Sequence, residues 1–102
     1  YADETTFDGV EVVDNIATEG GGGFAIVGVV TVTGSSVLRN SAPVGGGALL
    51  LEDGRVSSVD SDWGADADDN APGDVYAGAE VTGYGAAATF DCSTAIGCTP
   101  AP

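Results

Sequence analysis

The sequence predicts an all-β fold, specifically a right-handed parallel β-helix (β-solenoid) of about three to four coils. Three observations predict it: small glycine-rich composition, an asparagine-and-glycine motif that recurs along the chain, and short, evenly spaced apolar segments. With 17 Gly, one Trp, three Tyr and three Phe in 102 residues, the chain cannot fill a wide core. A thin architecture forming one domain over residues 1–102 suits this composition.

The repeat becomes visible when Asn15 is aligned with Asn40, and a weaker third copy begins at Asn70. In the first two copies the asparagine is followed by a pair of glycines and then by an apolar run. These glycines are Gly22, Gly23, Gly46 and Gly47. In stacked coils each asparagine would lie over its equivalent and form a hydrogen-bonded ladder, with rungs roughly 4.8 Å apart.

Helix is disfavoured throughout, because Gly, Val and Thr dominate and every apolar 3.6-residue pattern is interrupted by glycine. In the segment Val30–Thr33, two-residue alternation predicts that the valines face the core and the threonines face outward. The predicted strands are Val10–Val13, Ala25–Thr33, Ser36–Leu38, Ala48–Leu51, Val56–Val59, Val75–Ala77, Glu80–Thr82 and Ala86–Phe90.

An antiparallel β-sandwich is the alternative fold, because evenly spaced strands with glycine turns also describe a sandwich. The recurrence of the same Asn and Gly-Gly corner argues against it, since hairpins do not require one corner at a fixed period.

Two cysteines, Cys92 and Cys98, stand close together near the end of the sequence and predict a disulfide. A disulfide implies an oxidising compartment, so we expect a secreted, extracellular or cell-surface location. Residues 92–102 would form a disulfide-tied tail, and residues 1–7 an extended N-terminal arm.

The charge excludes several partners. Sixteen acidic residues against two arginines, with no Lys and no His, give a formal net charge of −14. Such a surface repels nucleic acid and anionic lipid, both of which are bound through clustered Lys and Arg. The longest apolar run, residues 25–32, is too short for the roughly 20 residues of a membrane span, so no membrane insertion is expected.

Catalysis is not predicted, and we name no catalytic residue. Without His or Lys the chain cannot form a Ser-His-Asp triad or a Schiff base. Paired carboxylates could hydrolyse a glycoside, but about three coils offer no long aromatic-lined cleft. No cofactor is therefore expected, with calcium as the one alternative. Its ligands would be Asp60, Asp62, Asp66, Asp68 and Asp69, although the EF-hand pattern fails there.

Trp63 lies within this acidic segment and has two interpretations. It could stack against a sugar ring as a glycan-binding residue, or it could cover the core with its large apolar face. The structural interpretation is favoured, because a chain this poor in aromatic residues needs its single Trp for packing.

Two of the repeated elements carry a family resemblance. Gly46–Leu49 reads Gly-Gly-Ala-Leu, and Val37–Asn40 reads Val-Leu-Arg-Asn. Together they resemble the repeat of polymorphic outer-membrane-protein-type right-handed β-helices of bacterial surface proteins, which carries Gly-Gly-Ala-aliphatic and Phe-x-x-Asn elements. Valine here replaces the phenylalanine. The resemblance implies an outer-surface protein, often adhesive or scaffolding, with no catalytic residues to carry over.

The sequence thus predicts a non-catalytic structural subunit of an extracellular or cell-surface fibre. Its partner would be itself, because the open ends of stacked coils can pair end to end and form a homo-oligomer or filament. An adhesin or glycan-binding passenger module is the first alternative, and a carbohydrate-active β-helix enzyme is the second.

Overall fold

The computed structural model describes residues 4–99, whose strands form three sheets. The sheet orders are β1-β4-β7-β10-β11, β2-β5 and β3-β6-β8-β9. The strands are β1 (Glu4–Asp8), β2 (Glu11–Val13), β3 (Phe24–Ile26), β4 (Val29–Thr33), β5 (Ser36–Leu38), β6 (Ala48–Leu50), β7 (Arg55–Ser61), β8 (Val75–Tyr76), β9 (Glu80–Val81), β10 (Ala88–Ser93) and β11 (Gly97–Thr99). A short 3-10 turn, η1, spans Asp66–Asp68, and none of the described helices is long and apolar enough to cross a membrane.

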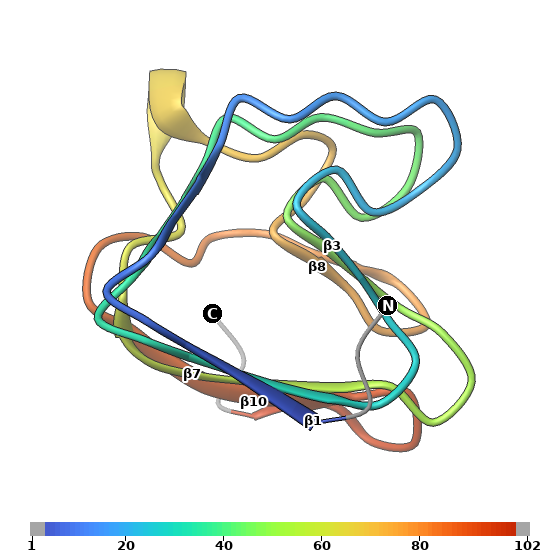
Figure 1. Ribbon diagram of the computed structural model, residues 1–102. Coiled ribbons are helices and arrows are strands. Elements are labelled where there is room, and N and C mark those ends of the chain that lie inside the picture. Colours follow the sequence, from blue (N-terminus) through green and yellow to red (C-terminus); the bar gives the residue numbers. More distant parts are fainter. Residues whose placement is uncertain (1–3, 100–102) are drawn as a thin grey trace.

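In the first part of the chain, successive passes follow the same path, as Figure 1 shows. We call residues 4–26, 29–50 and 55–76 the first, second and third layers. Between layers the strands pair in parallel: β1 with β4, β4 with β7, β2 with β5, β3 with β6, and β6 with β8. Val30 of the second layer lies beside Thr5 of the first and Val56 of the third.

The predicted parallel β-helix is wrong for this chain, because its two larger sheets are mixed. Strand β10 runs antiparallel to both β7 and β11, and β9 runs antiparallel to β8. The structure is therefore a small all-β fold that combines parallel and antiparallel pairs, and it does not continue as stacked coils to its end.

The change from parallel to antiparallel pairing follows from the turns after the third layer. The sequence contains no further Asn and Gly-Gly corner beyond Asn70 that would start another pass. Instead Gly78, at φ +81°, allows a tight turn that folds β9 back on β8, and Gly97, at φ +76°, turns the chain between β10 and β11. Glycine adopts these positive φ values without a Cβ clash.

The two larger sheets face each other across the core in a sandwich-like arrangement (Figure 1). The uniformly antiparallel pairing of the alternative prediction is absent from residues 4–99, since parallel pairs occur in both sheets. Strands β4 and β7 contribute Val30, Val32 and Val56 to the core, each at most 1% exposed. Because buried valines alternate with outward-facing threonines, the predicted orientation of β4 is observed.

Glycines line the places where the layers approach most closely. A Cβ on Gly22 would lie 2.5 Å from the carbonyl oxygen of Gly46, and one on Gly46 would lie 2.3 Å from that of Ala71. A Cβ on Gly47 would lie 2.2 Å from the carbonyl oxygen of Asp74. No real Cβ contact is that short, so only glycine allows backbone to pack on backbone at these corners.

The chain ends differ in part from the prediction. Within the expected N-terminal arm of residues 1–7, residues 4–7 belong to β1 and pair with β4, while residues 1–3 lie outside the described residues. The predicted disulfide between Cys92 and Cys98 is confirmed and joins β10 to β11. Residues 100–102 of the expected tail also lie outside the described residues.

The glycine spacing yields a stability prediction. Gly47→Ala should lower the free energy of unfolding by about 2–4 kcal/mol, because the layers must separate to admit the methyl group. Gly85→Ala is the matched control: its Cβ would meet nothing within 4 Å, so its effect should stay within about 0.5 kcal/mol. Urea denaturation of both variants measures the difference, and equal effects would contradict the argument.

Candidate functional site at the open end of the sheets

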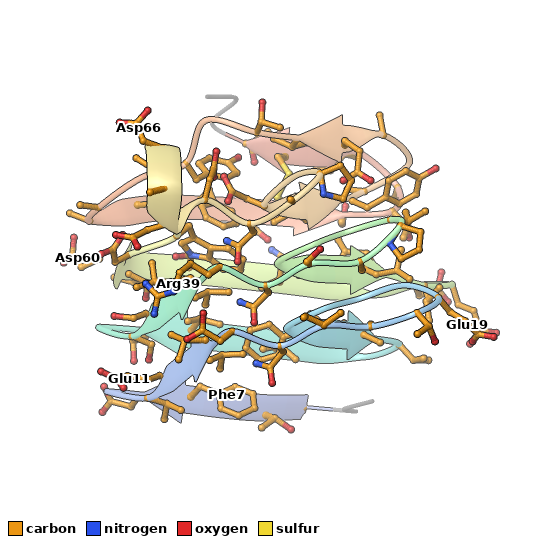
Figure 2. The ribbon with its side chains drawn as sticks, turned by 90° about the horizontal axis from the view of Figure 1, so that it is seen from above. Phe7, Glu11, Glu19, Arg39, Asp60 and Asp66 are labelled. Carbon is orange, nitrogen blue, oxygen red and sulfur yellow. A yellow bond between two sulfur atoms is a disulfide. The ribbon has the colours of Figure 1, made fainter. Side chains whose placement is uncertain are left out.

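The three sheets end together on one side of the molecule. Strands β1, β2 and β3 all belong to the first layer, and each has a sheet neighbour on one side only. Figure 2 shows this layer at one extreme of the stack, with Phe7 and Glu11 at its margin. We call the outward side of residues 4–26 the open end. At the opposite side, the two larger sheets finish in hairpin strands, β11 and β9.

The open end presents backbone groups to solvent. The amide of Gly9 donates to the carbonyl of Thr33 in the second layer, and the carbonyl of Phe7 accepts from the hydroxyl of Ser35. Since the backbone groups of successive strand residues point to opposite sides, those of Thr6 point away from β4. The outer edge of β1 is thus a row of donors and acceptors able to accept another strand.

Apolar side chains at the open end are only half buried. Phe7 and Phe24 meet edge to face with ring centroids 5.2 Å apart, and with Val12 they pack against the core. By contrast, Val37, which pairs with Val12 in the second layer, is fully buried. The first layer therefore contains core-type residues that have cover from one side only.

The three predicted ladder asparagines are brought together into a column. The backbone N–H and Nδ2 of Asn15 donate to Oδ1 of Asn40 at 3.1 and 2.9 Å. The same two groups of Asn40 donate to Oδ1 of Asn70, again at 3.1 and 2.9 Å. Each buried carboxamide also reaches a carbonyl of the layer before it: Nδ2 of Asn40 donates to Val12, and Nδ2 of Asn70 to Val37.

The column has a direction. It ends where Nδ2 of Asn70 donates to Oδ1 of Asp74 at 3.0 Å. It begins at Asn15, which is exposed, whereas Asn40 and Asn70 are 0% and 3% exposed. Among the described residues no donor bonds to Oδ1 of Asn15. The open end therefore presents an acceptor that, in the second and third layers, is occupied by donors from the asparagine of the preceding layer.

Asp74 is a buried carboxyl group that closes the column. Besides Asn70, the backbone N–H of Tyr84 donates to it at 3.0 Å. Burial raises the pKa of Asp74 to about 7; the hydrogen bonds from Asn70 and Tyr84 oppose this shift, and the charge of Asp69 adds to it. Because the side chain is 0% exposed, its ionisation is coupled to folding.

A second column, of alternating charge, runs beside the asparagines on the surface. The guanidinium of Arg39 contacts one carboxylate from the first layer and one from the third, Asp14 and Asp68, each at 2.7 Å. Its hydrogen bonds hold the pKa of Asp14 below the usual value. These groups are exposed, so the contacts contribute little stability. They do place a negative, a positive and a negative charge in three successive layers.

The predicted calcium ligands are not brought together. No group of three or more acidic, His or Cys side chains suited to a metal ion occurs among residues 4–99. Instead Asp68 contacts Arg39, and Oδ1 of Asp62 accepts from the backbone of Gly64 at 2.9 Å. Of the remaining three, Asp60, Asp66 and Asp69 are exposed, and Figure 2 shows Asp66 projecting on η1.

Trp63 lies in the core and is 0% exposed. Its Nε1 donates to Oγ of Ser58 at 3.0 Å, and its ring meets Phe90 edge to face. A sugar ring cannot reach this side chain in the folded protein, so the alternative glycan-stacking role does not fit its position, whereas the favoured packing role does.

Sequence reasoning missed Asp74 and the charge column. For the column a signal was present: a charged residue directly precedes each ladder asparagine, Asp14 and Arg39 in the first two layers and Asp69 in the third. The third copy is spaced five residues more widely, 30 against 25, and Asp68 takes the position opposite Arg39. For Asp74 no sequence signal distinguishes it from the many exposed acids.

The asparagine column predicts unequal costs along its length. Asn40→Ala should lower the free energy of unfolding by about 2–3 kcal/mol, because it leaves buried donors and acceptors unpaired. Asn15→Ala, at the exposed start, should cost less than about 1 kcal/mol. Chemical denaturation of both variants tests this gradient, which equal losses would rule out.

The buried Asp74 predicts a pH dependence of stability. Its native pKa lies above that of the unfolded chain, 3.8, so the native state keeps a proton that the unfolded chain loses. Its stabilising contribution is complete below about pH 4 and disappears as the pH rises through about 7, a change of up to about 4 kcal/mol. Asp74→Asn should remove this slope. Parallel stability curves for the two proteins between pH 4 and 8 would refute the prediction.

The comparisons with known proteins leave the geometry as the basis for function. No protein-family model, no curated protein and no solved structure matches this chain.

Proposed function

We propose that this chain is a non-catalytic structural subunit of an extracellular or cell-surface assembly, joined to its neighbour by strand addition at the open end. The observation that carries the proposal is the asymmetry of the sheets. The three first-layer strands have unpaired outer edges on the same side, whereas hairpins finish the two larger sheets on the other. A neighbouring strand would satisfy the backbone groups and cover the half-buried apolar residues at once.

The open end lacks several of the devices by which proteins block a sheet edge. These are lysine or proline on the edge strand, an inward-pointing charge and, within residues 4–99, a covering helix. Residues 4–26 contain neither lysine nor proline. The acids of β1, Glu4 and Asp8, are exposed, and between them Thr5 and Phe7 are half buried. This edge is suited to pairing.

The expected extracellular location is supported by the disulfide. A cystine between β10 and β11 persists in oxidising surroundings. The resemblance of the repeated elements to those of bacterial surface proteins favours the same location.

A structural role is favoured over the two alternatives. The single Trp, the best candidate for stacking on a glycan, is buried, which weakens the glycan-binding alternative. Paired carboxylates for glycoside hydrolysis would have to come from the same acidic segment as the predicted calcium ligands, but there Asp68 is paired with Arg39. The fibre predicted from the sequence is the form of this function in which the neighbour is a second copy, and electron microscopy of the purified chain tests that form.

Strand addition can be tested on the edge of β1. In the fold, residues 29–42 pair with the inner side of the first layer. A synthetic peptide of this sequence should therefore also bind the outer side, and it should protect the outward-facing amides of β1 from hydrogen exchange. Thr6→Pro removes an outward N–H and should weaken binding at least about tenfold, since proline cannot donate to a ladder. Thr6→Ala keeps the N–H and should bind like the wild type.

Isothermal titration calorimetry measures the affinity, and hydrogen exchange locates the site. Thermal unfolding of Thr6→Pro checks that the fold persists. Failure of the peptide to bind the wild type, or equal binding by a folded Thr6→Pro variant, would overturn the proposed function.

A further inference from the structure

The asparagine column specifies what the covering strand must carry. In the second layer and at Asn70 of the third, Oδ1 of the asparagine accepts two hydrogen bonds from the asparagine of the preceding layer, one from its backbone N–H and one from its Nδ2. At Asn15 this acceptor faces outward, and the side chain is exposed. A carboxamide donor in the covering strand would complete the pattern that already occurs twice.

The charge column specifies the residue beside it. Charges alternate through the layers from Asp14 to Arg39 to Asp68. The position below Asp14 would continue this alternation with a basic residue. The exposed acids Glu4, Asp8 and Glu11 lie on the same layer and also favour a covering strand without acids.

Neither end of a second copy offers these groups. Two copies that meet open end to open end are related by a twofold axis, so their strands run antiparallel and neither places an asparagine in the parallel register that the column requires. Both surfaces also carry exposed acids, which repel each other. The other end of a copy closes the column with the buried carboxyl group of Asp74, which supplies no amide donor. A copy of this chain is therefore a poor match for its own open end.

We propose that the open end is covered by a strand of a different polypeptide, which runs parallel to β1 and β2 and carries a basic residue followed by an asparagine opposite Asp14 and Asn15. This inference rests on the proposed function and names the partner that it requires. Recognition would combine ladder hydrogen bonds, which any strand can make, with carboxamide and charge contacts that select this one.

The test uses the peptide of residues 29–42, which contains no acid and holds Arg39 and Asn40 in the required order. A peptide with Asn40→Asp loses the side-chain Nδ2 donor, keeps the backbone N–H, and should bind the full chain roughly tenfold more weakly. A peptide with Ser41→Asp carries the same added charge one residue away and should lose no more than about threefold. The affinity of the parent peptide should fall several-fold between about 0.05 and 0.5 M NaCl, because salt screens the attraction of Arg39 to the acids.

Each result has one meaning. If the parent peptide binds but the two substituted peptides bind equally, the asparagine inference is overturned while strand addition stands. If the purified chain associates with itself more strongly as salt rises, and Thr6→Pro abolishes this, the partner is a second copy and the inference fails. If the parent peptide does not bind at all, the proposed function fails and the inference fails with it.

Discussion

The fold depends on backbone-to-backbone contact between the layers, which glycine alone permits at the corners. Where Gly46 and Gly47 pass beneath Ala71 and Asp74, the carbonyl oxygens come too close to leave room for a side chain. The same closeness allows the carboxamide of Asn40 to reach both Asn70 of the next layer and the carbonyl of Val12 in the previous one. The glycine positions and the asparagine column thus both follow from the short distance between the backbones of adjacent layers.

The stacking of the layers also leaves two unequal sides of the molecule. Parallel strands stacked in register leave a first and a last layer, and each must be covered or exposed. On the last layer the chain covers itself, because glycine turns allow β9 and β10 to fold back and pair antiparallel with β8 and β7. On the first layer no described segment does so. The proposed binding surface is therefore the layer that residues 4–99 leave uncovered.

Much of the local structure was predictable from the sequence. Each predicted strand overlaps an observed one, and the alternation over residues 30–33 predicts the correct buried side, because Val30 and Val32 lie two residues apart. The predicted segment 25–33 is two strands, since Gly28 lies between β3 and β4. The prediction of an N-terminal arm misses strand β1, although Thr5 and Phe7 alternate with exposed residues in the same way.

The global topology and the site were less accessible. A repeat predicts that layers stack, but it contains no information on where stacking stops, and the hairpins after Val75 depend on tertiary pairing with β7. The clustering of aspartates around Trp63 suggested a binding loop, yet the tryptophan points inward and the carboxylates stay dispersed. Sequence proximity alone does not say whether acidic side chains converge.

The two arginines give the surface a further property. Arg39 is held by Asp14 and Asp68, and Arg55 is paired with Asp91 across β7 and β10. Arg39 and Arg55 are also the only residues after which trypsin can cut, because the sequence contains no lysine. Both scissile positions lie in the middle of the stack, so digestion requires the layers to part. The rate of tryptic cleavage is therefore a direct readout of how often the interior layers separate.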